Sequence, residues 1–359
     1  MKKLVHGGDI YSHGKDKNKR IYDFSANINP LGVPSKVISA VKNCLGDCSN
    51  YPDPLCRDLI SKIANAECVK EEYIICGNGA ADVIFRIVLA VNPQKALLIA
   101  PTFAEYEKAL LTVNCNIDHF FLKEEDEFNI SEDFIDEIKD DYDIMFLCNP
   151  NNPTGKLIEP ELLKTIIEKA KQKDIILVID ECFIEFLKDS EKFTMKGCLG
   201  KYDNLIILRA FTKNYALAGF RLGFSMSSNE ELNEKILDMG QPWSVSTPAQ
   251  VAGIAALDEK EYLREAMELI YREKEFLIKE LRAMGFKVFD TKANYIFFKI
   301  EDGGLGKKAQ KFRKSMEEQG ILIRNCGNYI GLTGEYSRIA VKSNEDNLFF
   351  VETMKNIIW

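Results

Sequence analysis

Seven short apolar runs, separated by segments of helical periodicity, constrain the fold of this chain more than any other feature. The runs are Tyr73–Cys76, Ala96–Ala100, Asp118–Leu122, Ile144–Cys148, Ile175–Ile179, Leu205–Leu208 and Arg221–Met226. Most of them contain no polar residue in their interior, which is typical of strands buried on both faces. The alternation therefore predicts an α/β fold in which helices cover a largely parallel sheet.

The pattern changes after about Thr247. Residues 258–284 have the periodicity of a long amphipathic helix, and Gly285 follows at the position of a C-cap glycine. The rest mixes strands and helices, expected at Ala293–Ile300, near 306–319, at Ile321–Arg324, at Arg338–Val341 and from Asn344. A chain of 359 residues is expected to form about two domains. We predict a large cofactor-binding domain over residues 50–250 and a smaller α+β domain built from residues 1–49 and 251–359.

Composition excludes several classes of function. The chain has 47 basic and 55 acidic residues, a net charge of −8 that offers no footprint for nucleic acid. No apolar run approaches the roughly 18 residues of a membrane span, and the first residues lack the apolar stretch of a signal peptide. Ten cysteines without paired CxxC spacing, and only three histidines, argue against a metal site. We expect reduced thiols in a cytoplasmic protein.

Two polar turns follow predicted strands, at the sheet edge where open α/β sheets bind ligands. The first is Cys76-Gly77-Asn78-Gly79-Ala80-Ala81-Asp82, which opens an apolar helix. Small residues and the amides of a helix N-terminus suit a phosphate, although an ordinary strand-to-helix turn has the same composition. The second is Asn149-Pro150-Asn151-Asn152-Pro153-Thr154-Gly155, a rigid turn that can hold a side-chain amide in a fixed place.

Two charged residues stand at the same edge. Asp180 closes a buried strand, where a carboxylate is costly unless it has a partner. That partner can be a cationic ring nitrogen, the amides of a helix N-terminus that it caps, or the cation of an internal salt bridge. Lys213 lies in a largely apolar segment, which suits a Schiff-base lysine, although a lone lysine is more often a solvated one. Arg221 follows eight residues later. Together the four features ask for a ligand with a phosphate, a basic ring nitrogen, a ring hydroxyl and an aldehyde, which describes pyridoxal 5′-phosphate.

Over its whole length the sequence resembles the fold-type I pyridoxal-phosphate enzymes, the aspartate aminotransferase superfamily. The resemblance implies a mostly parallel seven-stranded sheet between helices, with a smaller α+β domain. It implies that Lys213 forms the Schiff base and moves the proton, that Asp180 pairs with the pyridine nitrogen, and that Asn152 donates to the ring hydroxyl. Arg221 and the turn Gly79, Ala80 and Ala81 would cradle the cofactor phosphate.

The same resemblance implies further roles. Tyr106 would stack on the cofactor ring, and Arg338 would clamp the substrate α-carboxylate. Tyr51 would reach the cofactor phosphate of the neighbouring subunit, so a homodimer with shared active sites is expected. The sequence departs from the superfamily at Ala210, where a serine usually helps to bind the phosphate. One lost hydrogen bond to a charged group is worth ~1.5–3 kcal/mol.

Two subgroups compete within the superfamily, the histidinol-phosphate aminotransferases and the threonine-phosphate decarboxylases of cobalamin synthesis. Three segments resemble the second: His6-Gly7-Gly8-Asp9, 23–32 (DFSANINPLG) and 323–332 (IRNCGNYIGL). By this resemblance His6 and Arg324 are candidates for the substrate phosphate, and Asn29 lies near the carboxylate. For His6 and Arg324, an N-terminal loop position and a salt bridge stay open as alternatives.

The expected activity is decarboxylation of an O-phospho-amino acid. L-Threonine O-3-phosphate would give (R)-1-amino-2-propanol O-2-phosphate and CO₂. The alternative is a histidinol-phosphate or related aminotransferase. The complete set of cofactor residues argues against a third reading, a binding or regulatory module. The sequence does not separate phosphothreonine from phosphoserine, since one methyl group is worth only ~1–3 kcal/mol.

Overall fold

All seven apolar runs form strands of one sheet in the computed structural model, which describes residues 6–12 and 20–357. The strand order is β2-β8-β7-β6-β5-β3-β4. Only β8 runs antiparallel to its neighbours, so the expected α/β fold with a mostly parallel sheet is confirmed. The bounds are β2 Ile74–Gly77, β3 Lys95–Ala100, β4 Asn116–Phe121, β5 Ile144–Cys148, β6 Ile176–Asp180, β7 Leu205–Ala210 and β8 Gly223–Met226.

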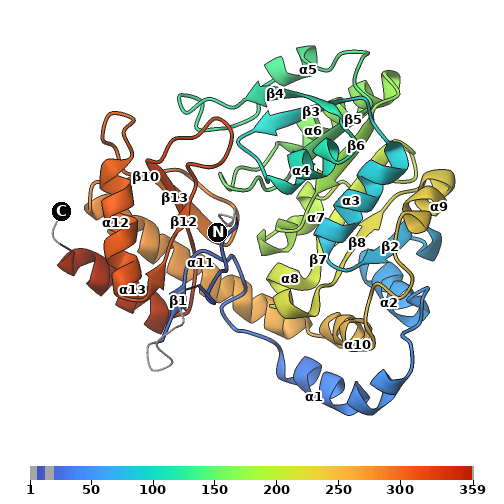
Figure 1. The fold of residues 1–359 in the computed structure, drawn as a ribbon, viewed down its shortest axis with the longest axis horizontal. Helices are drawn as coiled ribbons and strands as arrows, with labels where there is room; N and C mark the ends of the chain where they lie inside the picture. The colour runs from blue at the N-terminus through green and yellow to red at the C-terminus, as the bar shows by residue number, and fades with distance from the viewer. Residues whose placement is uncertain (1–5, 13–19, 358–359) are drawn as a thin grey trace.

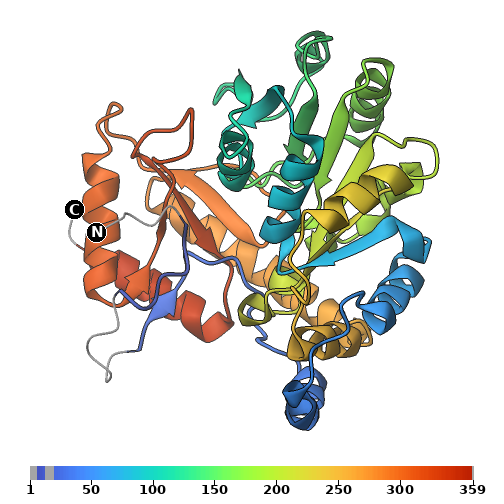
Figure 2. The same ribbon diagram turned by 45° about the vertical axis from the view of Figure 1, so that its right-hand side comes forward.

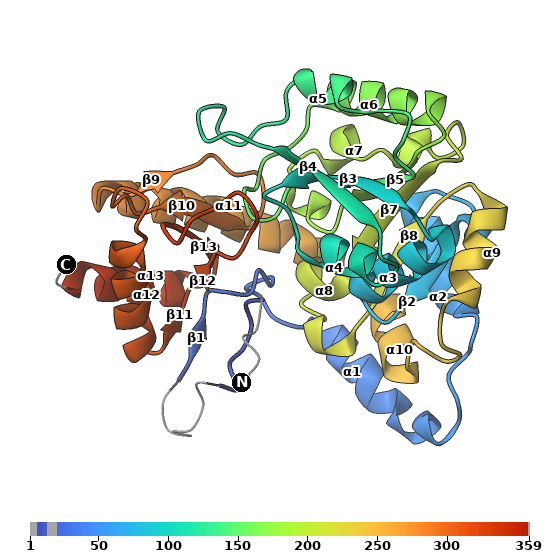
Figure 3. The ribbon, with the colours of Figure 1, turned by 45° about the horizontal axis from the view of Figure 1, so that its top comes forward.

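Helices cover both faces of this sheet because neighbouring strand residues point to opposite sides. Along β5, Ile144 and Phe146 pack with α3, α4 and α9, whereas Met145 and Leu147 pack with α2, α6 and α10. Figure 3 shows α3 and α6 on opposite sides of the strands. The bounds are α2 Arg57–Glu67, α3 Ala80–Val91, α4 Glu105–Leu111, α6 Pro160–Gln172, α9 Glu230–Asp238 and α10 Thr247–Ala256.

A second lobe holds a four-stranded antiparallel sheet of order β12-β13-β10-β9 (Figure 1). Its strands are β9 Lys287–Val288, β10 Tyr295–Lys299, β12 Arg324–Asn325 and β13 Tyr336–Ala340. Its helices are α11 Lys260–Ala283, α12 Lys307–Glu318 and α13 Asn344–Asn356. Gly285 has φ +81° just after α11, as a C-cap glycine requires.

The N-terminal segment belongs to both lobes. β1 (Tyr22–Asp23) pairs in parallel with β11 (Ile321–Leu322) in the small lobe. The chain then crosses to α1 (Ser35–Cys44), the blue helix below the large lobe in Figure 2. The predicted strand 321–324 is thus split at Ile323 between two sheets.

α1 packs on α10, and its Val37 lies in the apolar core of the large sheet. Residues 35–44 therefore lie on the large lobe, although the predicted domain limits assign 1–49 to the small one. An apolar helix face does not say which neighbour will cover it, so this placement has no local signal in the sequence. The other division, at 250/251, stays a prediction.

Three short α-helices complete the described chain: α5 Asp133–Asp136, α7 Ser190–Phe193 and α8 Phe211–Asn214. The 3₁₀ turns are Leu45–Ser49, Glu71–Tyr73, Ile184–Phe186, Lys196–Cys198 and Ala218–Phe220. Within residues 6–12 and 20–357, no helix combines the length and apolar character needed to cross a membrane. All ten cysteines are free thiols.

Candidate active site

A cavity of about 230 Å³ lies where strands of the large sheet end toward the small lobe. Cys148, Asp180 and Ala210 line it from the last positions of β5, β6 and β7. The small lobe contributes residues from the opposite side. The cavity brings together most of the predicted site residues, namely His6, Ala80, Ala81, Asn152, Asp180, Lys213, Arg221, Arg324 and Arg338.

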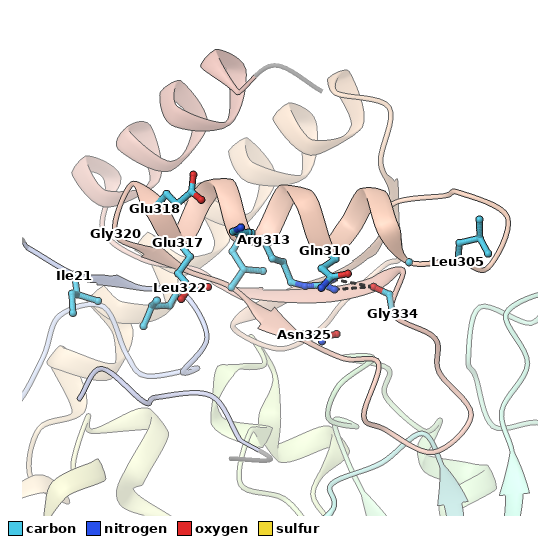
Figure 4. A pocket seen from close by; sticks show the side chains of 13 residues that line it. Ile21, Leu305, Gln310, Arg313, Glu317, Glu318, Gly320, Leu322, Asn325 and Gly334 are labelled. Atoms are coloured by element: carbon cyan, nitrogen blue, oxygen red, sulfur yellow. Dashed lines mark hydrogen bonds between the residues drawn. The ribbon is translucent and has the colours of Figure 1, made fainter. Parts of the chain in front are cut away.

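A larger hollow of about 970 Å³ lies on the small lobe, along α12 (Figure 4). There the Arg313 guanidinium donates to the carbonyl of Gly334 at 3.0 Å. None of the predicted site residues lines this hollow. Chemistry rather than size therefore marks the smaller cavity as the candidate active site.

The glycine turn is built to approach a cation and an anion closely. Gly79 has φ +86°, and a Cβ atom there would lie 2.5 Å from Nη2 of Arg221. The amides of Ala80 and Ala81, the first two of α3, have no acceptor within the helix. Two free amides, a helix N-terminus and a guanidinium thus meet at one place, which fits a phosphate group. Ala210 lines the same cavity without a hydroxyl.

Lys213 lies in α8, three residues past the end of β7. Burial lowers the pKa of its amine to about 8, helped by the positive charges of Arg338 and Arg221. Asp180 and Cys182 act in the opposite direction. More of the amine is therefore neutral near neutral pH than in an ordinary lysine, and the neutral amine is the form that condenses with an aldehyde.

Asp180 is buried, and its carboxylate is held by two donors. Oδ1 accepts from the amide of Cys182 at 3.0 Å, and Oδ2 accepts from the hydroxyl of Tyr106 at 2.6 Å. A carboxylate at the end of a buried strand that faces a cavity fits a cationic ring nitrogen.

The position expected for Tyr106 is wrong. Its side chain is fully buried, stacks on Phe146 with ring centroids 5.0 Å apart, and does not line the cavity. Phe103 lines the cavity instead. The two aromatic residues are three positions apart at the start of α4, and nothing local in the sequence says which one faces a ligand.

Asn152 and Arg338 are joined through one oxygen. Oδ1 of Asn152 accepts from Nη1 of Arg338 and from the hydroxyl of Tyr329, the latter at 3.1 Å. Because two donors occupy Oδ1, the Nδ2 group is the free donor of this amide. Nη2 of Arg338 donates to the carbonyl of Ser25 at 3.0 Å. Its buried Nε has no hydrogen-bond partner in the described part of the chain, which suits a bound carboxylate.

Asn29 does not line the cavity, contrary to its expected place near the carboxylate. Its Nδ2 donates to the carbonyl of Asn214 at 2.7 Å, and its amide donates to the carbonyl of Lys213 at 3.0 Å. Asn29 therefore fixes the backbone of the segment that carries Lys213, through these two hydrogen bonds. Asn27 lines the cavity, and its buried Oδ1 has no partner among the described residues. The two asparagines lie in one irregular loop, where the sequence has no period to orient them.

His6 and Arg324 lie at the edge of the cavity, and both also line a neighbouring hollow of about 230 Å³. Arg324 donates to Oδ1 of Asn328 at 2.7 Å and lies over the ring of Tyr329. Nε2 of His6 lies 2.5 Å from Oε1 of Glu105. Both side chains are thus placed at the mouth of the cavity.

Tyr51 lies outside the cavity of its own chain. Its side chain is 78% exposed and stacks on Trp243, with ring centroids 4.4 Å apart. An exposed aromatic pair of this kind is typical of a surface that contacts another molecule.

Besides Phe103 and Asn27, the cavity wall includes other residues that were not predicted to be in the site, among them Cys148, Cys182 and Tyr329. Burial raises the pKa of both thiols, which keeps them neutral beside Asp180. Single cysteines and tyrosines in strands and loops carry no spacing signal, so only the fold reveals them. Within the part of the chain that the structure describes, no group of three histidine, cysteine or acidic side chains is placed to hold a metal ion.

Comparison with known proteins adds relatives to this geometry. The family model for aminotransferase class I and II matches residues 19–352. Over 358 residues the chain is 36% identical to a protein of Caldanaerobacter subterraneus subsp. tengcongensis provisionally assigned as a threonine-phosphate decarboxylase, with 99% of this chain and 95% of that one covered. Over 358 residues it is 32% identical to the threonine-phosphate decarboxylase of Salmonella typhimurium, with 99% and 96% covered.

The fold has a close match among solved structures. The histidinol-phosphate aminotransferase from Clostridium acetobutylicum superimposes with a TM-score of 0.86 at 32% identity. The match covers 93% of this chain and 98% of that chain.

Proposed function

This chain belongs to the aminotransferase class I and II family, and on that premise we propose that it decarboxylates an O-phospho-amino acid. The substrate is L-threonine O-3-phosphate, and the products are (R)-1-amino-2-propanol O-2-phosphate and CO₂. One observation carries the proposal: a single cavity holds Lys213 and Asp180 together with cations at three places. A cofactor phosphate, a substrate carboxylate and a substrate phosphate need three such places.

The residues fit pyridoxal 5′-phosphate as the cofactor. The turn at Gly79 and the Arg221 guanidinium would hold its phosphate, Asp180 its ring nitrogen, and Nδ2 of Asn152 its hydroxyl. We assign the ring-facing aromatic position to Phe103 rather than to Tyr106. When bound, the cofactor supplies an aldehyde that condenses with amines and a ring that withdraws electrons from a bond at the substrate α-carbon.

The chain's own side chains would select which bond at the α-carbon breaks, because they fix how the substrate is oriented in the cavity. Arg338 would hold the substrate carboxylate through Nε, which has no hydrogen-bond partner among the described residues. His6 and Arg324 would hold the substrate phosphate at the mouth of the cavity. Fixing both anionic ends sets the rotation about the α-carbon. Lys213, with a pKa of about 8, would return a proton to that carbon after CO₂ leaves.

The active sites of a homodimer would be shared. The exposed stack of Tyr51 on Trp243 supports this proposal, because an aromatic pair on the surface of one subunit is free to reach its partner. Ten free cysteines support a reducing compartment, the cytoplasm.

The rival is a histidinol-phosphate aminotransferase, which the similarity to the Clostridium acetobutylicum enzyme supports. The test incubates the protein with pyridoxal phosphate and L-threonine O-3-phosphate, without any keto acid. The proposal predicts sustained release of CO₂ and of 1-amino-2-propanol O-phosphate over many turnovers. No release, with amino-group exchange between glutamate and 2-oxoglutarate once histidinol phosphate is added, would replace it with the aminotransferase.

A further inference from the structure

His6 is fixed to the large lobe by one buried carboxylate. Nε2 of His6 lies 2.5 Å from Oε1 of Glu105, the first residue of α4 and 99 positions away in the chain. The Glu105 side chain is only 10% exposed, whereas that of His6 is 44% exposed. The buried partner is thus the fixed one, and the partly exposed histidine is the one that it orients.

The neighbouring residues hold the same segment to the other lobe. The amide of Gly8 donates to Oγ of Ser25 at 2.8 Å. A Cβ atom at Gly7 would lie 2.3 Å from the carbonyl oxygen of Ser25, so the backbones pack directly on each other. That carbonyl also accepts from Arg338. The segment therefore spans the cavity mouth, from Glu105 on one side to the carboxylate-binding arginine on the other.

The start of α4 serves several parts of the cavity at once. Phe103 lines the cavity and lies 5.7 Å from the His6 ring, centroid to centroid. Tyr106 holds Asp180. Within the described part of the chain, Glu105 is the only hydrogen-bond partner of the His6 ring. Nε2 donates to this carboxylate, so Nδ1 is the nitrogen left for a ligand, and it donates to a phosphate when the ring carries both protons.

The geometry points to Glu105 as a positioning residue, whose carboxylate orients the His6 ring toward the phosphate group of the substrate. The inference rests on the proposed function for the identity of that substrate. Glu105 does not line the cavity and would not touch the ligand. Its carboxylate accepts a hydrogen bond from Nε2. This bond orients Nδ1 and the rest of the ring toward the mouth of the cavity, which Arg324 also lines.

The test measures binding of the reaction product, which needs no turnover. Holoenzyme is titrated by calorimetry with 1-amino-2-propanol O-phosphate, and with 1-amino-2-propanol as the phosphate-free control. Glu105→Ala is expected to raise the Kd of the phosphorylated amine about 10-fold, the usual weight of one hydrogen bond to a charged group. Glu105→Gln, which keeps an acceptor, should lose less. Neither should change the Kd of 1-amino-2-propanol.

A double-mutant cycle separates positioning from a general structural role. Once His6→Ala is present, Glu105→Ala should have no further effect on the phosphorylated amine. Lys108→Ala removes the other partner of Glu105, an exposed lysine 3.2 Å away, and should leave binding unchanged. In steady state, Glu105→Ala should raise KM for L-threonine O-3-phosphate by a larger factor than it lowers kcat.

Three results would overturn the inference. One is an unchanged Kd in Glu105→Ala, and another is an equal loss with and without His6. The third is wild-type holoenzyme that binds both amines equally well. Failure of the proposed function looks different, because the wild-type protein would then release no CO₂. The titrations of wild type, Glu105→Ala, His6→Ala and the double variant would still report whether Glu105 acts through His6.

Discussion

Replacing Gly79 by alanine tests the contact between the glycine turn and Arg221. The backbone there has φ +86° and ψ 158°, a region that is essentially restricted to glycine, and another residue costs about 1–3 kcal/mol in stability. The new Cβ atom would also lie 2.5 Å from Nη2 and 3.1 Å from Cζ of Arg221. The guanidinium is the flexible end of a long side chain, so it would move away and lose the bond that we propose it makes to the cofactor phosphate.

That bond is worth about 1.5–3 kcal/mol, which corresponds to a rise of about 10- to 100-fold in the Kd for pyridoxal phosphate. The assay titrates apoprotein with the cofactor and follows absorbance. Gly285→Ala is the matched control, because Gly285 has φ +81° and a Cβ atom there would meet nothing within 4 Å. Both variants should lose stability in urea, but only Gly79→Ala should lose cofactor affinity. Equal affinity in Gly79→Ala and wild type would refute the assigned cradle.

Three further predictions follow from buried charges. Lys213→Ala should abolish the visible absorbance of the lysine-bound cofactor and lower turnover at least about 100-fold, with unchanged far-UV circular dichroism; retained absorbance would assign the aldehyde to another amine. Arg338→Gln removes a positive charge that disfavours the protonated amine of Lys213, so the pKa of Lys213 should rise above about 8. This pKa is measured from the pH dependence of acylation in apoprotein. Lys274 is the control: burial gives it a pKa of about 8 as well, but Arg338 does not affect it, so its pKa should not change. Arg209→Gln leaves the buried carboxylate of Glu181 without its cationic partner at 3.0 Å, so the free energy of unfolding in urea should fall by about 3–5 kcal/mol. Breaking the exposed ion pair of Lys201 and Glu168 should cost under about 1 kcal/mol. Equal losses would contradict the buried network.

The sheet was largely predictable because its signal is local. Strands buried on both faces must be apolar along their whole length, and β5 was predicted with its observed limits, Ile144–Cys148. The direction of a strand has no such signal. β8 runs antiparallel between β2 and β7, which are parallel to each other. Its Gly223 has no side chain, and this leaves room for the amide nitrogen of Ala80: a Cβ atom at position 223 would lie 2.3 Å from it.

The site divides along the same line. Residues at strand ends were predictable, since the carboxyl ends of parallel strands meet at one edge, where Asp180 ends β6 and Lys213 follows β7. Residues in irregular segments were not. Asn27 rather than Asn29 lines the cavity, and Phe103 rather than Tyr106 does so. Loops have no repeat that tells one side of the chain from the other.

The layer architecture and the kinds of reactive side chain can be read from the sequence alone, because residue types and hydrophobic period are properties of the chain. Which charged side chains meet depends on the tertiary structure. Arg338 and Asn152 are 186 positions apart and meet at one oxygen, while His6 meets Glu105 across the mouth of the cavity. Contacts between segments so distant depend on how the two lobes pack, and packing is set by the whole core rather than by any local pattern.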